Sequence, residues 1–150
     1  MQPDVTLAPS ADENGLAHML AGLLSQNLLA KPHKMEDFAA LDGRVAVVAD
    51  DADVALTLHF HLGGRLVIHD GIVGIPDLTI RGPSEAIIAL SNLPAATPLG
   101  LPIPMPGDRE AVGAVRVVAS ALRHGKLHIY GALLRLPLFL KLGHVLSVNG

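Results

Sequence analysis

The sequence contains no cysteine and very few aromatic residues. Its 150 residues include three phenylalanines, one tyrosine and no tryptophan. The absence of cysteine excludes disulfides, thiolate catalysis and cysteine-based zinc sites, and it fits a reducing compartment. The scarcity of aromatic rings argues against surfaces that stack bases or sugars. Half of the residues are hydrophobic, so the core is aliphatic, which suits apolar ligands such as sterols or alkyl chains as well as an ordinary core.

Runs of positive charge and long apolar segments are also missing. The formal net charge is −3 and no basic run occurs, so the sequence predicts no nucleic-acid partner. No apolar segment reaches about 18 uninterrupted residues, and no N-terminal stretch has the pattern of a signal peptide. We therefore expect a cytoplasmic protein with one folded domain over residues 11–150, preceded by a flexible tail at 1–10.

The sequence lacks the common catalytic motifs. It has no Gly-x-Ser-x-Gly elbow, no His-Glu-x-x-His, no phosphate loop and no Gly-x-Gly-x-x-Gly. We therefore expect no enzymatic activity and no cofactor. Eight histidines and scattered acids still leave the hydrolysis of acyl esters as an alternative.

The N-terminal third predicts two helices. Residues 1–9 carry two prolines and no periodicity, and we expect a loose tail there. Ser10 and Glu13 form a capping-box pattern that opens a helix with apolar residues at helical spacing. Pro32 separates this helix from a shorter segment that contains Phe38.

The middle of the chain predicts a meander of strands over residues 44–49, 54–62, 65–69, 72–75 and 77–81. Asp50, Asp51 and Asp53 crowd the first reversal, where aspartate is common in turns.

Glycines at 63 and 64 mark the next turn. A two-residue loop there would place Leu66 and Ile68 on the polar face of the partner strand, whereas a three-residue loop places them beside Leu62 and Phe60. We predict the three-residue loop.

In that register three histidines share the outer face of the sheet. His59 and His69 face each other, and His61 lies nearby. Three imidazoles are able to bind zinc, but the segment has no carboxylate at ligand spacing. We therefore interpret them as exposed strand histidines and predict no metal.

Helices follow the strands. Gly82, Pro83 and Glu85 begin a short helix, and Asp108 caps a longer one with an apolar stripe at Val112, Val115, Val118, Ala119 and Leu122. Between them, residues 94–107 hold five prolines that alternate with apolar residues, so we expect this segment to lie on apolar surface.

The last quarter of the chain combines a strand with an unusually apolar tail. Gly125 to Gly131 reads Gly-Lys-Leu-His-Ile-Tyr-Gly, so Leu127 and Ile129 share one face. Residues 133–148 are apolar on nearly all sides, which predicts a buried, membrane-associated or ligand-covering helix. The whole pattern predicts an α+β fold, a single layer of about five mostly antiparallel strands covered on one side by helices.

Two motifs in this order resemble the sterol carrier protein type 2 family. They are Asp77-Leu78-Thr79-Ile80 and the Gly125–Gly131 segment before an apolar terminal helix. The resemblance covers about residues 12–148 and implies an apolar tunnel that carries sterols, fatty acids, fatty acyl-CoA or phospholipids without chemistry. Two features depart from the family pattern: Ala132 follows the final glycine, and the chain ends Val-Asn-Gly rather than in a peroxisomal tripeptide.

We expect the lining of this tunnel to be nine apolar residues on inward faces: Phe60, Ile80, Val115, Leu122, Leu127, Ile129, Leu138, Leu142 and Leu146. An acyl-CoA ligand would need cations at the mouth, for which Lys126, Arg123 and Arg135 are candidates.

The terminal helix is predicted to be the gate, because Pro137 and Gly143 weaken it. Its polar stripe, Lys141 and His144, would then face solvent or a membrane surface.

Alternatives remain for the terminal helix. It is equally consistent with a plain core helix or with a dimer face in an accessory protein, and the sequence leaves the oligomeric state open.

Overall fold

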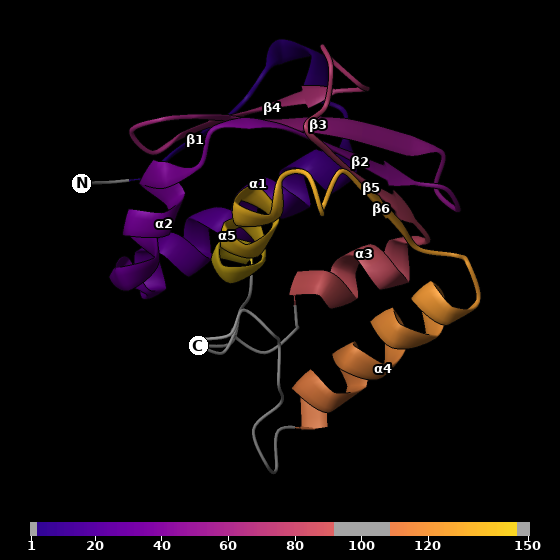
Figure 1. The fold of residues 1–150 in the computed structure, drawn as a ribbon. Coiled ribbons are helices and arrows are strands. Elements are labelled where there is room, and N and C mark those ends of the chain that lie inside the picture. The colour runs from indigo at the N-terminus through magenta and orange to yellow at the C-terminus, as the bar shows by residue number, and fades with distance from the viewer. Residues whose placement is uncertain (1–2, 92–108, 147–150) are drawn as a thin grey trace.

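The computed structural model describes residues 3–91 and 109–146. They form one mixed β-sheet with five α-helices on one side (Figure 1). The strands are β1 (Asp4–Leu7), β2 (Gly43–Ala49), β3 (Val54–His61), β4 (Arg65–Asp70), β5 (Leu78–Gly82) and β6 (His128–Tyr130). The helices are α1 (Gly15–Ala30), α2 (Met35–Ala40), α3 (Ser84–Ser91), α4 (Arg109–Arg123) and α5 (Leu136–Leu146). Short 3₁₀ turns are η1 (Pro9–Ala11) and η2 (Pro32–Lys34). The predicted α+β architecture is confirmed.

The sheet has the strand order β1-β4-β3-β2-β5-β6. The pairs β2–β3, β3–β4 and β5–β6 are antiparallel, whereas β1–β4 and β2–β5 are parallel. Within the described ranges, no helix is long and apolar enough to cross a membrane. The predicted apolar segment at 94–107, the Asp108 cap and residues 147–150 lie outside the description.

Strand β1 was not predicted from the sequence. The prediction of a loose N-terminal tail is therefore wrong for residues 4–7. Asp4 to Leu7 pairs with Arg65 to Ile68 in parallel register. Val5 and Leu7 pack against the core. A strand of four residues is too short to be recognised from its alternation of apolar and polar residues. It is held by backbone pairing with β4, which is distant in the sequence.

The β3–β4 hairpin has a loop of the predicted length, three residues, but the register differs from the predicted one by two residues, because the loop is 62–64 and His61 pairs with Arg65. Phe60 pairs with Leu66 and Leu58 pairs with Ile68, and all four side chains are buried. Leu62 is not a strand residue as predicted: it lies in the loop and is 68% exposed.

The predicted strand at 72–75 is absent, because residues 71–77 cross the outer face of the sheet instead of extending it. The Thr57 hydroxyl donates to the carbonyl of Gly71 at 2.7 Å and accepts from the backbone N–H of Val73 at 2.9 Å. The segment is therefore anchored on a buried threonine, and Ile75 remains 86% exposed.

Helix α1 begins after Asn14 and not at the predicted capping box. The Asn14 side chain accepts from the backbone N–H of Ala17 at 3.1 Å. Its amide group donates to the carbonyl of Ala55 at 3.1 Å and to the Asp70 carboxylate at 2.8 Å. The same side chain therefore caps the helix and joins it to β3 and β4. Ser10 instead lies in η1 and accepts from the backbone N–H of Asp70 at 3.3 Å.

Candidate functional site

Most of the predicted lining residues meet in one core between the sheet and the helices. Six of the nine are buried, and Ile129 is partly buried against them. The six are Phe60, Ile80, Leu127, Leu138, Leu142 and Leu146. The structure therefore brings strands β3, β5 and β6 together with α5 around one apolar centre.

Leu122 is not on the inward face as predicted. It is 49% exposed, because α4 turns Val118 and Ala121 inward instead. Residues three apart share a helix face, and Leu122 lies about 100° away from Ala121. Ala119, of the same predicted stripe, is also exposed, and the side chains of Val112 and Val115 lie outside the description.

The two motifs that suggested a family are neighbours in the sheet. Ile80 of β5 pairs with Ile129 of β6 in antiparallel register. Gly131 has φ +85°, and a Cβ there would collide with the Asp77 carbonyl oxygen. The last glycine of the motif is therefore required by the close approach of the chain to the start of β5.

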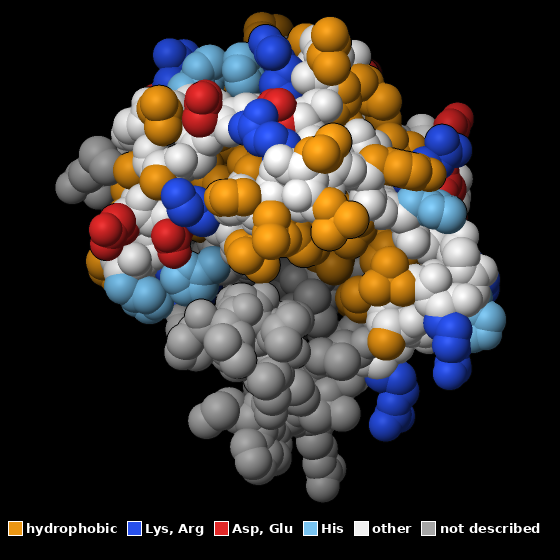
Figure 2. All heavy atoms as spheres, viewed as in Figure 1, with side chains coloured by type: hydrophobic (Ala, Val, Ile, Leu, Met, Phe, Trp, Pro, Cys, Tyr) orange, Lys and Arg blue, Asp and Glu red, His pale blue; other side chains and the backbone are white. Residues whose placement is uncertain are grey.

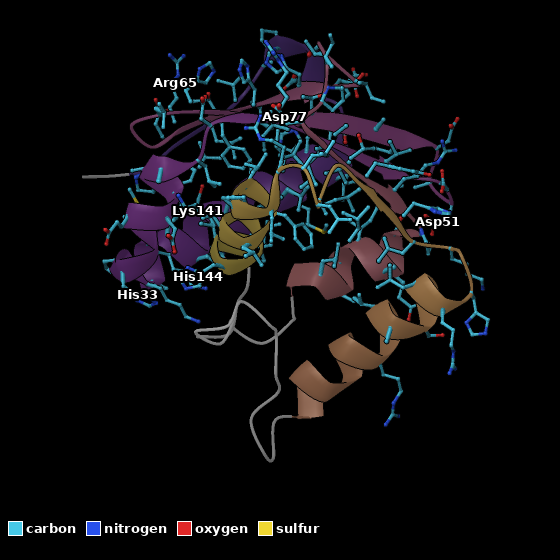
Figure 3. The ribbon with its side chains drawn as sticks, viewed as in Figure 1. His33, Asp51, Arg65, Asp77, Lys141 and His144 are labelled. Carbon is cyan, nitrogen blue, oxygen red and sulfur yellow. The ribbon has the colours of Figure 1, made fainter. Side chains whose placement is uncertain are left out.

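One side-chain contact holds the start of α5 and another holds its last turn (Figure 3). Arg135, just before the helix, pairs with Asp77 at 2.7 Å between Nη1 and Oδ1. The other Asp77 oxygen accepts from the backbone N–H of Arg44 at 2.9 Å. Further along, His144 contacts the Asp37 carboxylate on α2. The prediction that His144 faces solvent or a membrane is therefore corrected, since it is directed at α2.

A buried asparagine holds the end of α5. The Asn27 amide on α1 donates to the carbonyl of Leu146 at 2.9 Å and to that of Val145 at 3.4 Å. It satisfies carbonyls that a helix end leaves without partners. Sequence reasoning missed this residue, although an asparagine between leucines on a buried helix is a detectable signal.

The turn before α5 is exposed, so the first leucines of the apolar tail do not pack in the core. Leu133 and Leu134 are 92% and 90% exposed, and Leu136 is 44% exposed. We call these three residues the leucine ledge. Figure 2 shows hydrophobic side chains gathered in the middle of the view, over the region where α5 begins.

A cleft of about 320 Å³ lies beside the leucine ledge. It is lined by Ala40, Leu41, Asp42, Leu134, Arg135, Pro137, Leu138 and Lys141. Of the predicted mouth cations, Arg135 lines this cleft.

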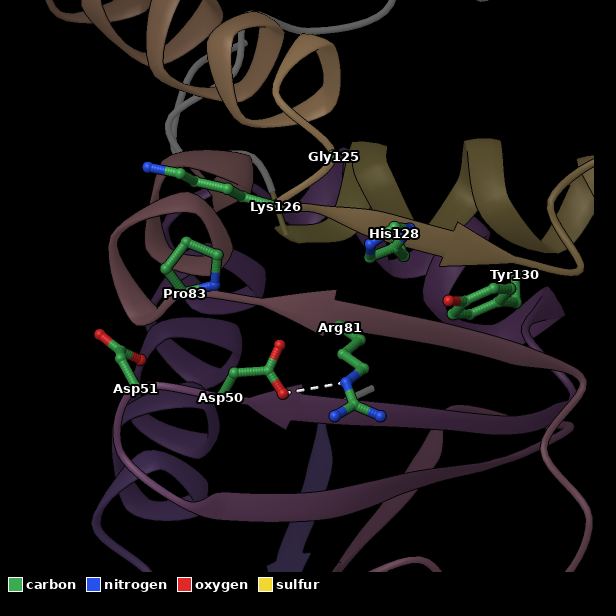
Figure 4. Close-up of a pocket in the computed structure, with 8 residues that line it drawn as sticks. All are labelled: Asp50, Asp51, Arg81, Pro83, Gly125, Lys126, His128 and Tyr130. Carbon is green, nitrogen blue, oxygen red and sulfur yellow. Dashed lines mark hydrogen bonds and ion pairs between the residues drawn. The ribbon is translucent and has the colours of Figure 1, made fainter.

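A second and larger cleft of about 610 Å³ is lined by charged and polar residues together with Pro83 and Gly125 (Figure 4). The predicted mouth cation Lys126 lies on its wall. Arg81 pairs there with Asp50 at 2.9 Å. Asp51 accepts from the backbone N–H of Ser84 at 2.8 Å and from its hydroxyl at 2.7 Å, and these bonds lower the pKa of Asp51. The aspartates of the predicted turn therefore hold β5 and the start of α3.

The three histidines lie on the outer face, but not in the predicted register. His69 is opposite Thr57, and His59 is opposite Val67. The ring centroids of His59 and His61 are 4.0 Å apart, and those of His59 and His69 are 6.4 Å apart. In the part of the chain that the structure describes, no group of three or more histidines and acids is arranged to hold a metal.

Comparison with known proteins agrees with this architecture. No family model matches the sequence, and no curated protein matches it. A solved structure described as "UbiJ-SCP2 Ubiquinone synthesis protein" superposes with a TM-score of 0.54, over 87% of this chain and 94% of that chain, at 14% identity. The chain has the sterol carrier protein type 2 (SCP2) fold. In this SCP2 fold the apolar centre built by β5, β6 and α5 is the candidate site.

Proposed function

We propose that this SCP2-fold domain binds a hydrophobic lipid non-covalently and carries it without chemical change. The observation that carries the proposal is the SCP2 fold itself, which spans 87% of the chain and places an aliphatic helix over the sheet. The ligand classes are a sterol, a fatty acid, a fatty acyl-CoA or a phospholipid. The description of the neighbour as a ubiquinone synthesis protein adds isoprenoid quinones to the classes to be tested.

The ligand would lie between the sheet and α5, against the nine apolar residues named above. Burial of an alkyl chain is worth about 0.8 kcal/mol per CH₂, so a long chain reaches micromolar affinity after the costs of binding. Seven of those residues now pack against one another or border the core. Loading therefore requires part of the helix layer to open.

Native mass spectrometry after gentle purification, combined with displacement of a fluorescent fatty acid, tests the function. We expect a co-purified lipid and saturable displacement by at least one ligand class. Absence of both, across sterols, fatty acids, acyl-CoA and isoprenoid quinones, would end the proposal. Steady hydrolysis of acyl-CoA or of p-nitrophenyl esters that is lost on replacing one histidine would instead favour the enzyme alternative.

We propose further that α5 gates the site from its N-terminal end. The Arg135–Asp77 pair is partly exposed, and Pro137 lacks an N–H in the first turn of the helix. The other end holds Val145, fully buried, and is fixed by Asn27. Opening at the start of the helix therefore costs fewer contacts than opening at its end.

Replacing Arg135 by glutamine is expected to raise the rate of ligand release about three- to fivefold. A partly exposed ion pair contributes up to about 1 kcal/mol, which corresponds to that range. Stopped-flow release of a fluorescent fatty acid measures the rate. Arg81→Gln is the matched control, since Arg81 also pairs with an aspartate, at 2.9 Å, but away from α5. Equal rates in the two variants would contradict the gate.

Loading from a membrane would use the leucine ledge. Two adjacent leucines that are about nine-tenths exposed project into solvent, and apolar side chains of this kind enter the acyl boundary of a bilayer. Lys141 lies on the neighbouring cleft wall. The occupant that we propose is a lipid bilayer.

The double variant Leu133→Ser, Leu134→Ser is expected to slow lipid transfer between vesicles several-fold while leaving equilibrium affinity unchanged. Transfer of a fluorescent lipid between donor and acceptor vesicles measures this. The control is Leu29→Ser, Leu62→Ser, which removes two exposed leucines elsewhere. If the ledge is instead a dimer face, the first double variant will change the sedimentation coefficient and leave transfer intact.

A further inference from the structure

The face of the sheet opposite the helices carries a cluster of basic groups that lipid carriage does not use. Arg44 of β2 lies directly opposite His59 of β3 in the antiparallel register. His61 lies 4.0 Å from His59 between ring centroids, and His69 of β4 lies 6.4 Å away. We call these four residues the outer-face cluster. Figure 2 shows basic and histidine side chains gathered along the top of the view, on this side of the sheet.

The guanidinium of Arg44 is held in place on this face. The segment over residues 71–77 lies against it, and a Cβ at Gly74 would be 2.9 Å from its Nε. That Nε is buried and has no hydrogen-bond partner among the described residues. Because the 71–77 segment covers Nε, an anion on this face would be attracted by the charge of the guanidinium and would contact its terminal nitrogens.

Burial and the charges around His59 favour its neutral form. Burial, His61, Arg44 and His69 lower the pKa of His59, in that order, and Asp42 opposes them. The same effects predict that a bound anion would raise this pKa, because it would offset the positive neighbours.

The other charged groups near the cluster have partners. Arg65, opposite His61 in the register, is 3.7 Å from Asp4. Asp70, at the end of β4, accepts from the Asn14 amide. Asp77, at the end of the 71–77 segment, is occupied by Arg135 and by the Arg44 backbone. Of the nearby acids, Asp42 is therefore the one that acts on the cluster.

Arginine decides which kind of ion the cluster accepts. A guanidinium stays charged at every accessible pH, so it repels a metal cation held by the neighbouring imidazoles. It forms strong charge-assisted bonds with phosphate oxygens, and a protonated imidazole adds further donors.

We propose that the outer-face cluster binds a phosphate-bearing anion, with Arg44 as the permanent charge and His59, His61 and His69 as donors that strengthen on protonation. The site lies on the face away from the proposed lipid site and does not depend on lipid carriage. The same chemistry fits a soluble phosphate or pyrophosphate group and the head group of a phosphatidic acid.

Histidine-selective NMR of the whole chain tests the proposal. Titration of the imidazole resonances with and without inorganic pyrophosphate should show a higher pKa for His59 when the anion is present. The affinity for the anion at a pH below both pKa values of His59 should exceed that at a pH above both by about tenfold for each unit by which the pKa rises. A His59 pKa that pyrophosphate and phosphatidic acid vesicles both leave unchanged would overturn the proposal.

Variants and a second source of phosphate sharpen the test. His59→Gln should reduce the difference in affinity between pH 5.5 and pH 8, whereas His18→Gln on α1 should leave it unchanged. Equal losses in both variants would contradict the site.

Binding of soluble pyrophosphate supports a free phosphate ligand. Binding confined to vesicles with phosphatidic acid, compared with phosphatidylcholine vesicles, supports a head group. The NMR titration uses the unmodified chain, so its result does not depend on whether a variant folds. It also does not depend on whether the domain binds a lipid.

Discussion

Replacing Leu142 by alanine is expected to lower the free energy of unfolding by about 2–5 kcal/mol, the range for a buried leucine whose cavity collapses only in part. Leu142 is 1% exposed and lies in the middle of α5, within the core. Urea denaturation followed by circular dichroism measures the change. Ligand retention should weaken as well, because the same side chain belongs to the proposed lining.

Leu134→Ala is the matched control for this variant. It makes the same chemical change in the turn just before α5, on a side chain that is 90% exposed. Its free energy of unfolding should change by less than about 0.5 kcal/mol. Similar losses in the two variants would mean that α5 does not pack as described.

The same packing bears on how the gate is tested. Deleting residues 133–150 would remove Leu138, Leu142, Val145 and Leu146 from the core together. We expect such a chain to unfold. An unfolded chain would not show whether the start of α5 opens to admit a ligand. Release of the Arg135–Asp77 pair is therefore the sharper experiment.

Gly131→Ala is expected to destabilise the domain by about 3 kcal/mol, from the left-handed backbone and from overpacking together. Gly131 has φ +85°, and the new Cβ would press on the Asp77 carbonyl. Because that carbonyl belongs to the backbone just before β5, it has little freedom to move. The β5–β6 pairing would loosen, and with it the start of α5.

Gly143→Ala separates this effect from a general cost of replacing glycine. Gly143 lies inside α5, and a Cβ there meets nothing within 4 Å. Alanine should stabilise the helix by about 0.5–1 kcal/mol. Urea denaturation of both variants should therefore give changes of opposite sign. Two changes of the same sign and size would contradict the role assigned to Gly131.

The sequence was most informative where a local pattern and the tertiary structure agree. The unbroken alternation from Val54 to Phe60, followed by paired glycines, predicts the loop length because a wrong register would expose a whole apolar face. The Asp77–Ile80 and Gly125–Gly131 motifs likewise indicated the fold, and the structure places them on adjacent strands.

Features that depend on distant parts of the chain were missed. β1 forms only because β4 offers a ladder, and Ile72 to Ile75 looked like a strand although Thr57 holds that segment across the sheet. The exposure of Leu133 and Leu134 was missed for a similar reason. Apolar composition favours burial, but these two residues lie in the turn between β6 and α5, where their side chains are exposed.

The hydrogen bond from Asn27 to Leu146 has a consequence for the order of folding. It joins residues 119 positions apart, and contacts of such separation carry a high loop-closure cost and form slowly. The β2–β3–β4 meander closes through short loops and can form without them. We therefore expect α5 to dock after the transition state, so that substitutions in its buried face accelerate unfolding and leave the refolding rate nearly constant.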